Sequence, residues 1–217
     1  QSTLPSLGEG KLKHRENPRA YGSDAEHALF KPDDEKWYQT KAIEFSRLQI
    51  CVELFLFSHQ YCDVSTLSAL PKYTAGQLYH YPAFAAASQG DKFEADLAHA
   101  LTRPTAFEAV MRVRCTKGLK VSAFFGNFFV RGTDLLALPN CTPDSTYALE
   151  ISHEEETTFG AQLATMQAAL LYTSSSGERR IRVMTTVAPV TASAAELYSS
   201  VDIDALSNLL AKQALDA

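Results

Sequence analysis

The stretch "EAVMRVRCTKGL", residues 108–119, decides how the fold is read. Its valines and methionine are typical of β-strands, and the Thr-Lys-Gly at 116–118 is typical of a turn, so the segment predicts a strand that folds back. Side chains alternate between the two faces of a strand. Arg112 and Arg114 are therefore expected to point the same way, roughly 7 Å apart. Two guanidinium groups side by side on an acidic protein require an explanation.

The strand pattern continues beyond this stretch to about residue 190. Runs typical of strands are "FEAVMRVRC" (107–115), "LKVSAFFGNFFV" (119–130), "TYALEIS" (146–152) and "ATMQAALLYTSSSGERRIRVMTTVAPV" (164–190). In the last run, Ser175-Ser176-Gly177 predicts a hairpin turn between two long arms. Strands that follow one another without helices predict an antiparallel β-sandwich or barrel over residues 104–190.

The segment before it, residues 1–103, predicts an α/β unit. About 30 polar residues are expected to form a loop, followed by an amphipathic helix in "KPDDEKWYQTKAIEFSRLQ" (31–49). The apolar run "ICVELFLF" (50–57) is typical of a buried parallel strand. Asp63 is expected to cap a short helix that Pro71 helps to close. "AGQLYHYP" (75–82) and "GDKFEADLAHALTR" (90–103) then predict a strand and a helix.

The last 27 residues, 191–217, predict the first helices of a helical domain. Leu206, Leu209 and Leu210 form an apolar stripe in "SAAELYSSVDIDALSNLLAKQALDA" (193–217). Such a stripe needs a cover, and one or two parallel strands do not make a stable sheet. We therefore expect the chain to be an excerpt of a longer protein.

Composition narrows the class of protein. The chain has 217 residues, 46% of them hydrophobic, and a net charge of −5. No apolar run approaches the ~18–20 residues that a membrane span needs. Residues 101–132 carry six basic side chains and one acidic side chain, a local charge of +5 that leaves −10 for the remainder. This local basic surface indicates binding of one specific anionic partner rather than general binding of polyanions, although a solvent-exposed strand face with a few lysines would have the same composition.

A search for chemistry gives mostly negative results. Nucleotide-binding, nucleophile-elbow and zinc-protease motifs are absent, and the four cysteines have no ligand-like spacing. "DVSTL" (63–67) is one hydroxyl short of the metal signature of von Willebrand A domains, because Leu67 stands at the fifth position. His80 is interpreted as a strand-end histidine rather than a proton shuttle. Arg179, Arg180 and Arg182 fit either an exposed hairpin arm or a partner-binding strand, and both readings stay open.

Taken together, the motifs resemble a known family along the whole chain. "LTRPTAFEAVMRVRCTKGLKVSAFFGNFFVRGTDLLALPN" and "AALLYTSSSGERRIRVMT" resemble the cargo-adaptor subunit of the inner COPII coat (the Sec-twenty-four type). "ELFLFSHQYCDVSTLSALPKYTAGQLYHYP" resembles the end of its von Willebrand A-like trunk, and "LYSSVDIDALSNLLAKQALD" the start of its helical domain. The opening "QSTLPSLGEGKLKHRENP" is similar to the vertebrate C and D paralogues. The GTPase-activating sister subunit, which shares "RRIRV", is the alternative.

The resemblance implies a function and a site. It implies a non-enzymatic adaptor that selects transmembrane cargo and SNARE proteins by acidic signals on their cytosolic tails, for transport from endoplasmic reticulum to Golgi. Arg112 and Arg114 match the family's cargo-binding arginines. An alternative is that one of them is a structural ion-pair partner of Glu108. No catalytic residue, metal ligand or cofactor is expected in this segment, since the family's zinc module lies outside it.

The resemblance also implies partners and a location. The partners are the sister subunit in a heterodimer, the coat's small GTPase through that complex, and the tails of cargo and SNARE proteins, with no nucleic acid. The expected location is cytoplasmic, peripheral on the endoplasmic reticulum membrane and on COPII-coated vesicles.

Overall fold

The computed structural model describes residues 1–32, 36–154, 160 and 162–216. The chain divides into two compact units, the first made mainly of residues 1–108 and the second mainly of residues 109–126, 130–137 and 144–217. The elements up to residue 102 are η1 (Pro18–Ala20), α1 (His27–Phe30), α2 (Trp37–Arg47), β1 (Leu54–Leu56), α3 (Val64–Leu67), α4 (Ala69–Tyr73), β2 (Leu78–His80) and α5 (Ala86–Thr102).

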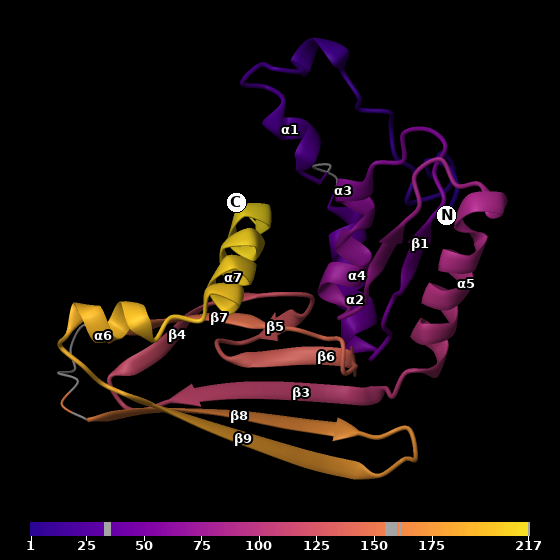
Figure 1. Ribbon diagram of the computed structural model, residues 1–217. Coiled ribbons are helices and arrows are strands. Elements are labelled where there is room, and N and C mark those ends of the chain that lie inside the picture. Colours follow the sequence, from indigo (N-terminus) through magenta and orange to yellow (C-terminus); the bar gives the residue numbers. More distant parts are fainter. Residues whose placement is uncertain (33–35, 155–159, 161, 217) are drawn as a thin grey trace. The chain divides into compact units, whose positions relative to one another are not determined.

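The first unit is built on the parallel pair β1 and β2, which aligns Leu54 with Leu78. In Figure 1, α2 and α4 lie on one side of this pair and α5 on the other. The buried core on the α2 side includes Tyr38, Leu56 and Leu67. The predicted parallel strand-and-helix arrangement is therefore confirmed.

The side of the pair that faces α5 is packed with aromatic rings. Phe55 of β1 stacks on Tyr79 of β2 with 4.5 Å between ring centroids, and Phe57 stacks on Tyr81 at 5.3 Å. Phe93 of α5 meets Phe55 and Phe57 edge-on. Aromatic pairs in these two geometries are attractive beyond the area that they bury. This cluster fixes α5 against the two strands.

Some predicted details of this unit are wrong. The run 50–57 is a strand only at Leu54–Leu56. The backbone at Val52 instead lies against Gly76. A Cβ added to Gly76 would lie 1.9 Å from the Val52 carbonyl oxygen. Pro71 does not close a helix but lies inside α4, within its first turn, where its missing N–H is tolerated. The first three acidic residues of the predicted helix at 31–49 lie outside the described residues.

Arg103, directly after α5, is buried and joins three segments of the first unit. Its Nη2 donates to Glu53 Oε1 at 2.8 Å and its Nη1 donates to Gln77 Oε1 at 2.8 Å. Burial raises the pKa of Glu53, and the charge of Arg103 opposes that rise. The guanidinium therefore fixes the C-terminal end of α5 to the segments that precede β1 and β2.

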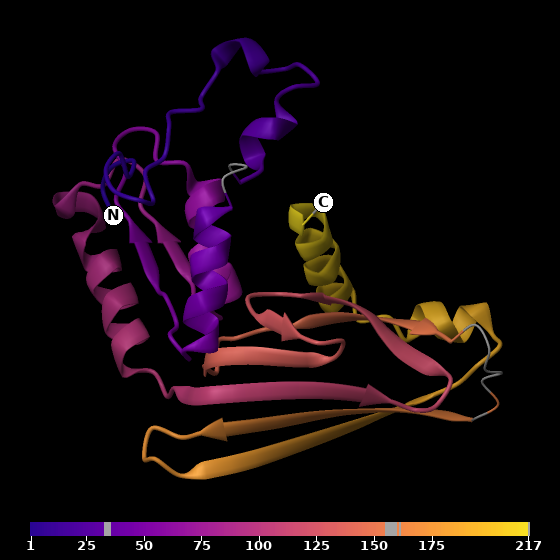
Figure 2. The ribbon, with the colours of Figure 1, turned by 180° about the vertical axis from the view of Figure 1, so that it is seen from behind.

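Beyond residue 102, the described residues form seven strands and two helices. They are β3 (Ala106–Cys115), β4 (Leu119–Phe125), β5 (Phe129–Arg131), β6 (Leu135–Cys141), β7 (Ala148–His153), β8 (Leu163–Thr173), β9 (Arg179–Pro189), α6 (Ala194–Ser199) and α7 (Ile203–Asp216). One sheet has the strand order β5-β6-β3-β8-β9, and β4 and β7 form a separate antiparallel pair. Figure 2 shows the long β8–β9 hairpin from behind. The all-β region predicted between the helical segments is confirmed.

The hairpin follows its prediction in detail. β8 and β9 pair antiparallel from Leu163 opposite Pro189 to Thr173 opposite Arg179. Gly177 in the turn has φ of 84°, a left-handed conformation that glycine adopts without strain, and its N–H donates to the Ser174 carbonyl at 2.9 Å. The turn chemistry at 175–177 therefore fixes which residues of the two arms face each other.

Two strand predictions are wrong. The run 119–130 is not one strand, because it breaks at Gly126, where φ of 138° is incompatible with a continuing strand of ordinary residues. β6 is missing from the predicted set. It contains Pro139, which removes a ladder donor, and residues 136–139 are all buried, so the period-2 alternation that marks a half-exposed strand is absent.

The two last helices form as predicted. Within the chain, Leu206 and Leu210 of α7 remain 44% and 54% exposed. Leu209, the third leucine of the stripe, is half-buried, so the expectation of an uncovered stripe holds for two of its three leucines. In the part of the chain that the structure describes, every helix is too short or too polar to cross a bilayer.

Candidate functional site

β3 carries the predicted arginine pair. Ala109 and Met111 are buried, whereas Arg112 is half-buried and Arg114 is exposed. Because strand side chains alternate, the two arginines lie on the face opposite Ala109 and Met111. One face of β3 therefore contributes to the core while the other presents guanidinium groups to the outside.

Arg112 has an acidic neighbour that the sequence did not reveal. Its Nε lies 3.1 Å from Oδ2 of Asp134, and the two side chains are 41% and 40% exposed. The Nε–H is not aligned for a hydrogen bond to any described residue, so the contact is an ion pair. The alternative that one arginine of the pair is a structural ion-pair partner therefore stays open for Arg112, but the partner is Asp134 and not Glu108, the example considered from the sequence.

Arg114 differs from its neighbour. It is exposed, and no described residue forms an ion pair or hydrogen bond with it. Three further cations between residues 112 and 134 are exposed as well: Lys117, Lys120 and Arg131. Between residues 109 and 143, Asp134 is the single acidic residue of the sequence. This part of the chain therefore carries an excess of positive charge with one internal counter-charge, located beside Arg112.

The arginines of β9 differ from those of β3, because two of them interact within their own hairpin. Arg179 donates to the Thr173 hydroxyl across the hairpin at 2.9 Å, and Arg180 forms an ion pair with Glu178 that raises the pKa of Arg180. Arg182 is exposed. The first two arginines thus support the hairpin itself. Between the two interpretations of this arm, an exposed hairpin fits Arg179 and Arg180, and the question stays open for Arg182.

The metal-like stretch 63–67 holds an internal cation. Arg15 Nε donates to Asp63 Oδ2 at 2.9 Å, and Arg15 Nη2 donates to Asp63 Oδ1 at 2.7 Å. Arg15 Nη2 also donates to Ser65 Oγ at 3.1 Å and to the Lys31 carbonyl at 3.0 Å. The Asp63 side chain is 1% exposed. Both oxygens of the Asp63 carboxylate, which a metal ion would need as ligands, therefore already accept hydrogen bonds from the Arg15 guanidinium.

The protonation of Asp63 follows from these contacts. Burial alone would raise the pKa of Asp63, but hydrogen bonds from Arg15, Ser65 and Thr66 outweigh it and lower the pKa of that carboxyl. Asp63 also accepts from the Thr66 backbone N–H at 3.3 Å, so it caps α3 as predicted. Among the described residues, no three His, Cys, Asp or Glu side chains gather into a possible metal site.

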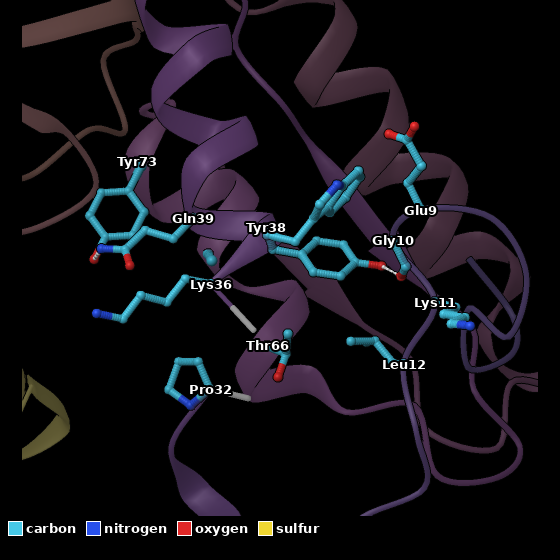
Figure 3. A pocket seen from close by; sticks show the side chains of 12 residues that line it. Glu9, Gly10, Lys11, Leu12, Pro32, Lys36, Tyr38, Gln39, Thr66 and Tyr73 are labelled. Carbon is cyan, nitrogen blue, oxygen red and sulfur yellow. Dashed lines mark hydrogen bonds between the residues drawn. The ribbon is translucent and has the colours of Figure 1, made fainter. Parts of the chain in front are cut away.

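A pocket of about 230 Å³ lies beside this cluster in the first unit (Figure 3). Trp37 and Tyr38 of α2 and Tyr73 of α4 supply much of its apolar lining. Tyr38 Oη donates to the Gly10 carbonyl at 2.6 Å, and Gln39 Nε2 donates to Tyr73 Oη at 2.9 Å. This pocket was not predictable from the sequence, because residues 9–12 of the opening loop complete it from a distant part of the chain.

The histidine and the cysteines considered as reactive groups lie in surroundings that do not activate them for catalysis. His80 ends β2, as predicted, and its Nε2 lies 3.1 Å from Ser58 Oγ. All four cysteines are free thiols. Burial raises the pKa of Cys51 to about 12, which suppresses the reactive thiolate.

Comparisons with known proteins agree with this architecture. Residues 1–101 match the Sec23/Sec24 trunk domain, and residues 106–191 match the Sec23/Sec24 beta-sandwich domain. The chain therefore belongs to the Sec23/Sec24 family and carries these two domains in the order found.

Its relatives within the family are Sec24 proteins. The chain is 47% identical to protein transport protein SEC24 A of Arabidopsis thaliana over 217 residues, all of this chain and 21% of that protein. It is 48% identical to Sec24B of Homo sapiens over 219 residues, all of this chain and 17% of that protein. The chain thus spans about a fifth of the length of these curated relatives.

A solved structure gives the same result. The crystal structure of the human COPII-coat protein Sec24c superposes with a TM-score of 0.90 at 36% identity, covering 98% of this chain and 29% of that one. The human Sec24B protein is more similar in sequence than this C-type protein. The predicted likeness of the opening segment to the C and D paralogues therefore does not extend to the chain as a whole.

Proposed function

We propose that this chain is the trunk and β-sandwich part of a COPII cargo adaptor, which selects transmembrane cargo and SNARE proteins by acidic signals on their cytosolic tails. The observation that carries the proposal is the arginine pair on one face of β3, with Arg114 exposed and Arg112 only partly neutralised by Asp134. Family membership supports it, since the relatives are Sec24 proteins.

The chemistry of the pair suits a carboxylate ligand. A guanidinium offers two parallel N–H donors that match the two oxygens of a carboxylate, and lysine does not reproduce this geometry. Two such groups roughly 7 Å apart on one strand suit two acidic residues separated by one residue on an extended peptide, because side chains on one face of any strand have the same spacing. An Asp-x-Glu signal is the simplest ligand of this kind.

The proposed role is binding rather than catalysis. The proposed partners are the sister subunit of the inner coat and, through that complex, the coat's small GTPase. Peripheral membrane contact is part of the proposal, since each Lys or Arg near an anionic lipid surface contributes on the order of 1 kcal/mol. The alternative, the GTPase-activating sister subunit, is not favoured because the relatives are Sec24 proteins.

A binding assay combined with a GTPase assay tests this function. Full-length protein should be retained by immobilised tail peptides that contain Asp-x-Glu and released when both acids are replaced by their amides. Added alone to the GTP-loaded coat GTPase, it should not accelerate hydrolysis. Equal retention on acidic and amide peptides would contradict the adaptor role, and strong acceleration of hydrolysis would support the sister-subunit alternative.

A further inference from the structure

The guanidinium of Arg15 fills a position whose surroundings are those of a bound cation. Its Nη2 nitrogen carries two hydrogens but approaches four oxygen atoms of the described residues. These are Asp63 Oδ1 at 2.7 Å, the Lys31 carbonyl at 3.0 Å, Ser65 Oγ at 3.1 Å and Thr66 Oγ1 at 3.4 Å. Because the oxygens outnumber the hydrogens, they surround the positive charge as ligands surround a metal ion.

The two hydroxyl groups of this set are already oriented for a cation. Thr66 Oγ1 donates to Asp63 Oδ2 at 3.0 Å. Ser65 Oγ donates within the set as well, since Asp63 Oδ1 lies at 2.9 Å and the Lys31 carbonyl at 3.2 Å. A hydroxyl has one hydrogen and two lone pairs, so a hydroxyl whose hydrogen is used in this way has its lone pairs left for a cation. All four oxygens therefore act as acceptors towards the Nη2 position.

The ligand set indicates which ion would fit. Carboxylate, carbonyl and hydroxyl oxygens are the hard ligands that calcium and magnesium take. Magnesium requires a nearly ideal octahedron of short bonds, whereas calcium accepts irregular sets and longer distances. The oxygens around Nη2 come from a loop carbonyl and from consecutive turns at 63–66, and their distances differ widely. This irregular arrangement favours calcium over magnesium.

We propose that the oxygens around Arg15 Nη2 form a latent cation site, which Arg15 occupies as a tethered cation and which takes up calcium when the guanidinium is withdrawn. In the wild-type chain, Arg15 makes this part of the first unit independent of metal. Asp63 is the one carboxylate of the site, and calcium affinity rises with the number of charged ligands. The dissociation constant for calcium should therefore be about 0.1–1 mM, the range of weak calcium modules.

The test is the thermal midpoint of full-length Arg15→Ala with and without calcium. The protein is prepared in chelator and then melted in chelator or in about 10 mM calcium chloride. A ligand that binds only the folded state stabilises it in proportion to the logarithm of its excess over the dissociation constant. The midpoint of the variant should therefore rise by roughly 5–10 °C in calcium and by less in magnesium. Wild type and Arg15→Lys, in which a tethered cation remains, should not respond.

A matched pair of controls separates this site from a general effect of calcium. Asp63→Asn added to Arg15→Ala removes the carboxylate ligand and should abolish the response. Arg47→Ala removes an exposed arginine at the end of α2 and should leave the protein without a response. The inference is wrong if calcium does not raise the midpoint of Arg15→Ala, or if it raises the midpoints of either control as much. If Arg15→Ala is unfolded in chelator, recovery of its circular dichroism signal in calcium supports the site, and no recovery overturns it.

Discussion

Replacing Arg15 by alanine should destabilise the first unit, because it leaves a buried carboxylate without its cation. The Asp63 side chain is 1% exposed, and the Arg15 side chain is 19% exposed, so the pair is largely shielded from water. Removing one partner of a buried pair costs about 3–5 kcal/mol. Ser65 and Thr66 still donate to Asp63, which favours the lower end of that range.

The magnitude can be converted into a melting temperature. The size of the first unit lies between the domains for which 1 kcal/mol corresponds to about 4–8 °C and those for which it corresponds to about 2–4 °C. At about 4 °C per kcal/mol, a loss of about 3 kcal/mol predicts a fall of roughly 12 °C in the transition of this unit. Differential scanning calorimetry of the full-length protein measures it. Arg47→Ala is the matched control: Arg47 is exposed at the end of α2, and its loss should change stability by no more than about 0.5 kcal/mol.

A second variant separates charge from packing. Asp63→Asn added to Arg15→Ala removes the unpaired charge and should restore part of the lost stability, since the penalty comes mainly from the uncompensated carboxylate. The reasoning would be refuted if Arg15→Ala lowered the midpoint no more than Arg47→Ala does. It would also be refuted if the double variant were less stable than Arg15→Ala, because the effects of the two substitutions would then add as they do at independent sites.

Three further predictions concern the first unit. Arg103→Ala should cost about 3–5 kcal/mol in chemical denaturation because Glu53 loses its buried partner, and a loss below 1 kcal/mol would contradict this. Because the pKa of Asp63 is lowered in the folded state, its contribution is fully present above the unfolded value of about 4 and is lost as pH falls through the folded value. The difference in unfolding free energy between wild type and Asp63→Asn should therefore shrink as the pH falls. A difference that grows on acidification would contradict this prediction. Titration calorimetry with magnesium should detect no binding that depends on Asp63, whereas heat abolished by Asp63→Ala would show a metal site.

Local signals predicted much of the fold. The β8–β9 hairpin was predictable because alternation, turn residues and strand length all agree over residues 163–189. β6 was not, because its apolar run contains Pro139 and lacks alternation. The break at Gly126 was hidden by the strand-forming residues on both sides of it. Fold details were therefore missed where a glycine or proline overrides a favourable local composition.

The site was predictable in part. Alternation places Arg112 and Arg114 on one face from sequence alone, and the family resemblance supplies their proposed role. The contacts that set their electrostatics were not predictable, because Asp134 reaches Arg112 only through the pairing of β6 with β3. The Arg15–Asp63 pair is also non-local, because the two partners are 48 positions apart in the sequence. Ion pairs between distant segments leave no periodic trace in a sequence.

The most direct test of the account is a titration of an Asp-x-Glu peptide into full-length protein with Arg112→Ala or Arg114→Ala. Each change should weaken binding by roughly 1.5–3 kcal/mol, the range for hydrogen bonds to charged groups, with the larger effect at the unpaired Arg114. Lysine at either position should restore only part of the affinity, because the bidentate geometry is lost. Assembly with the sister subunit, followed in parallel by pull-down, should persist in every variant. Unchanged peptide affinity together with lost folding or assembly would show that Arg112 and Arg114 are structural and would contradict the account.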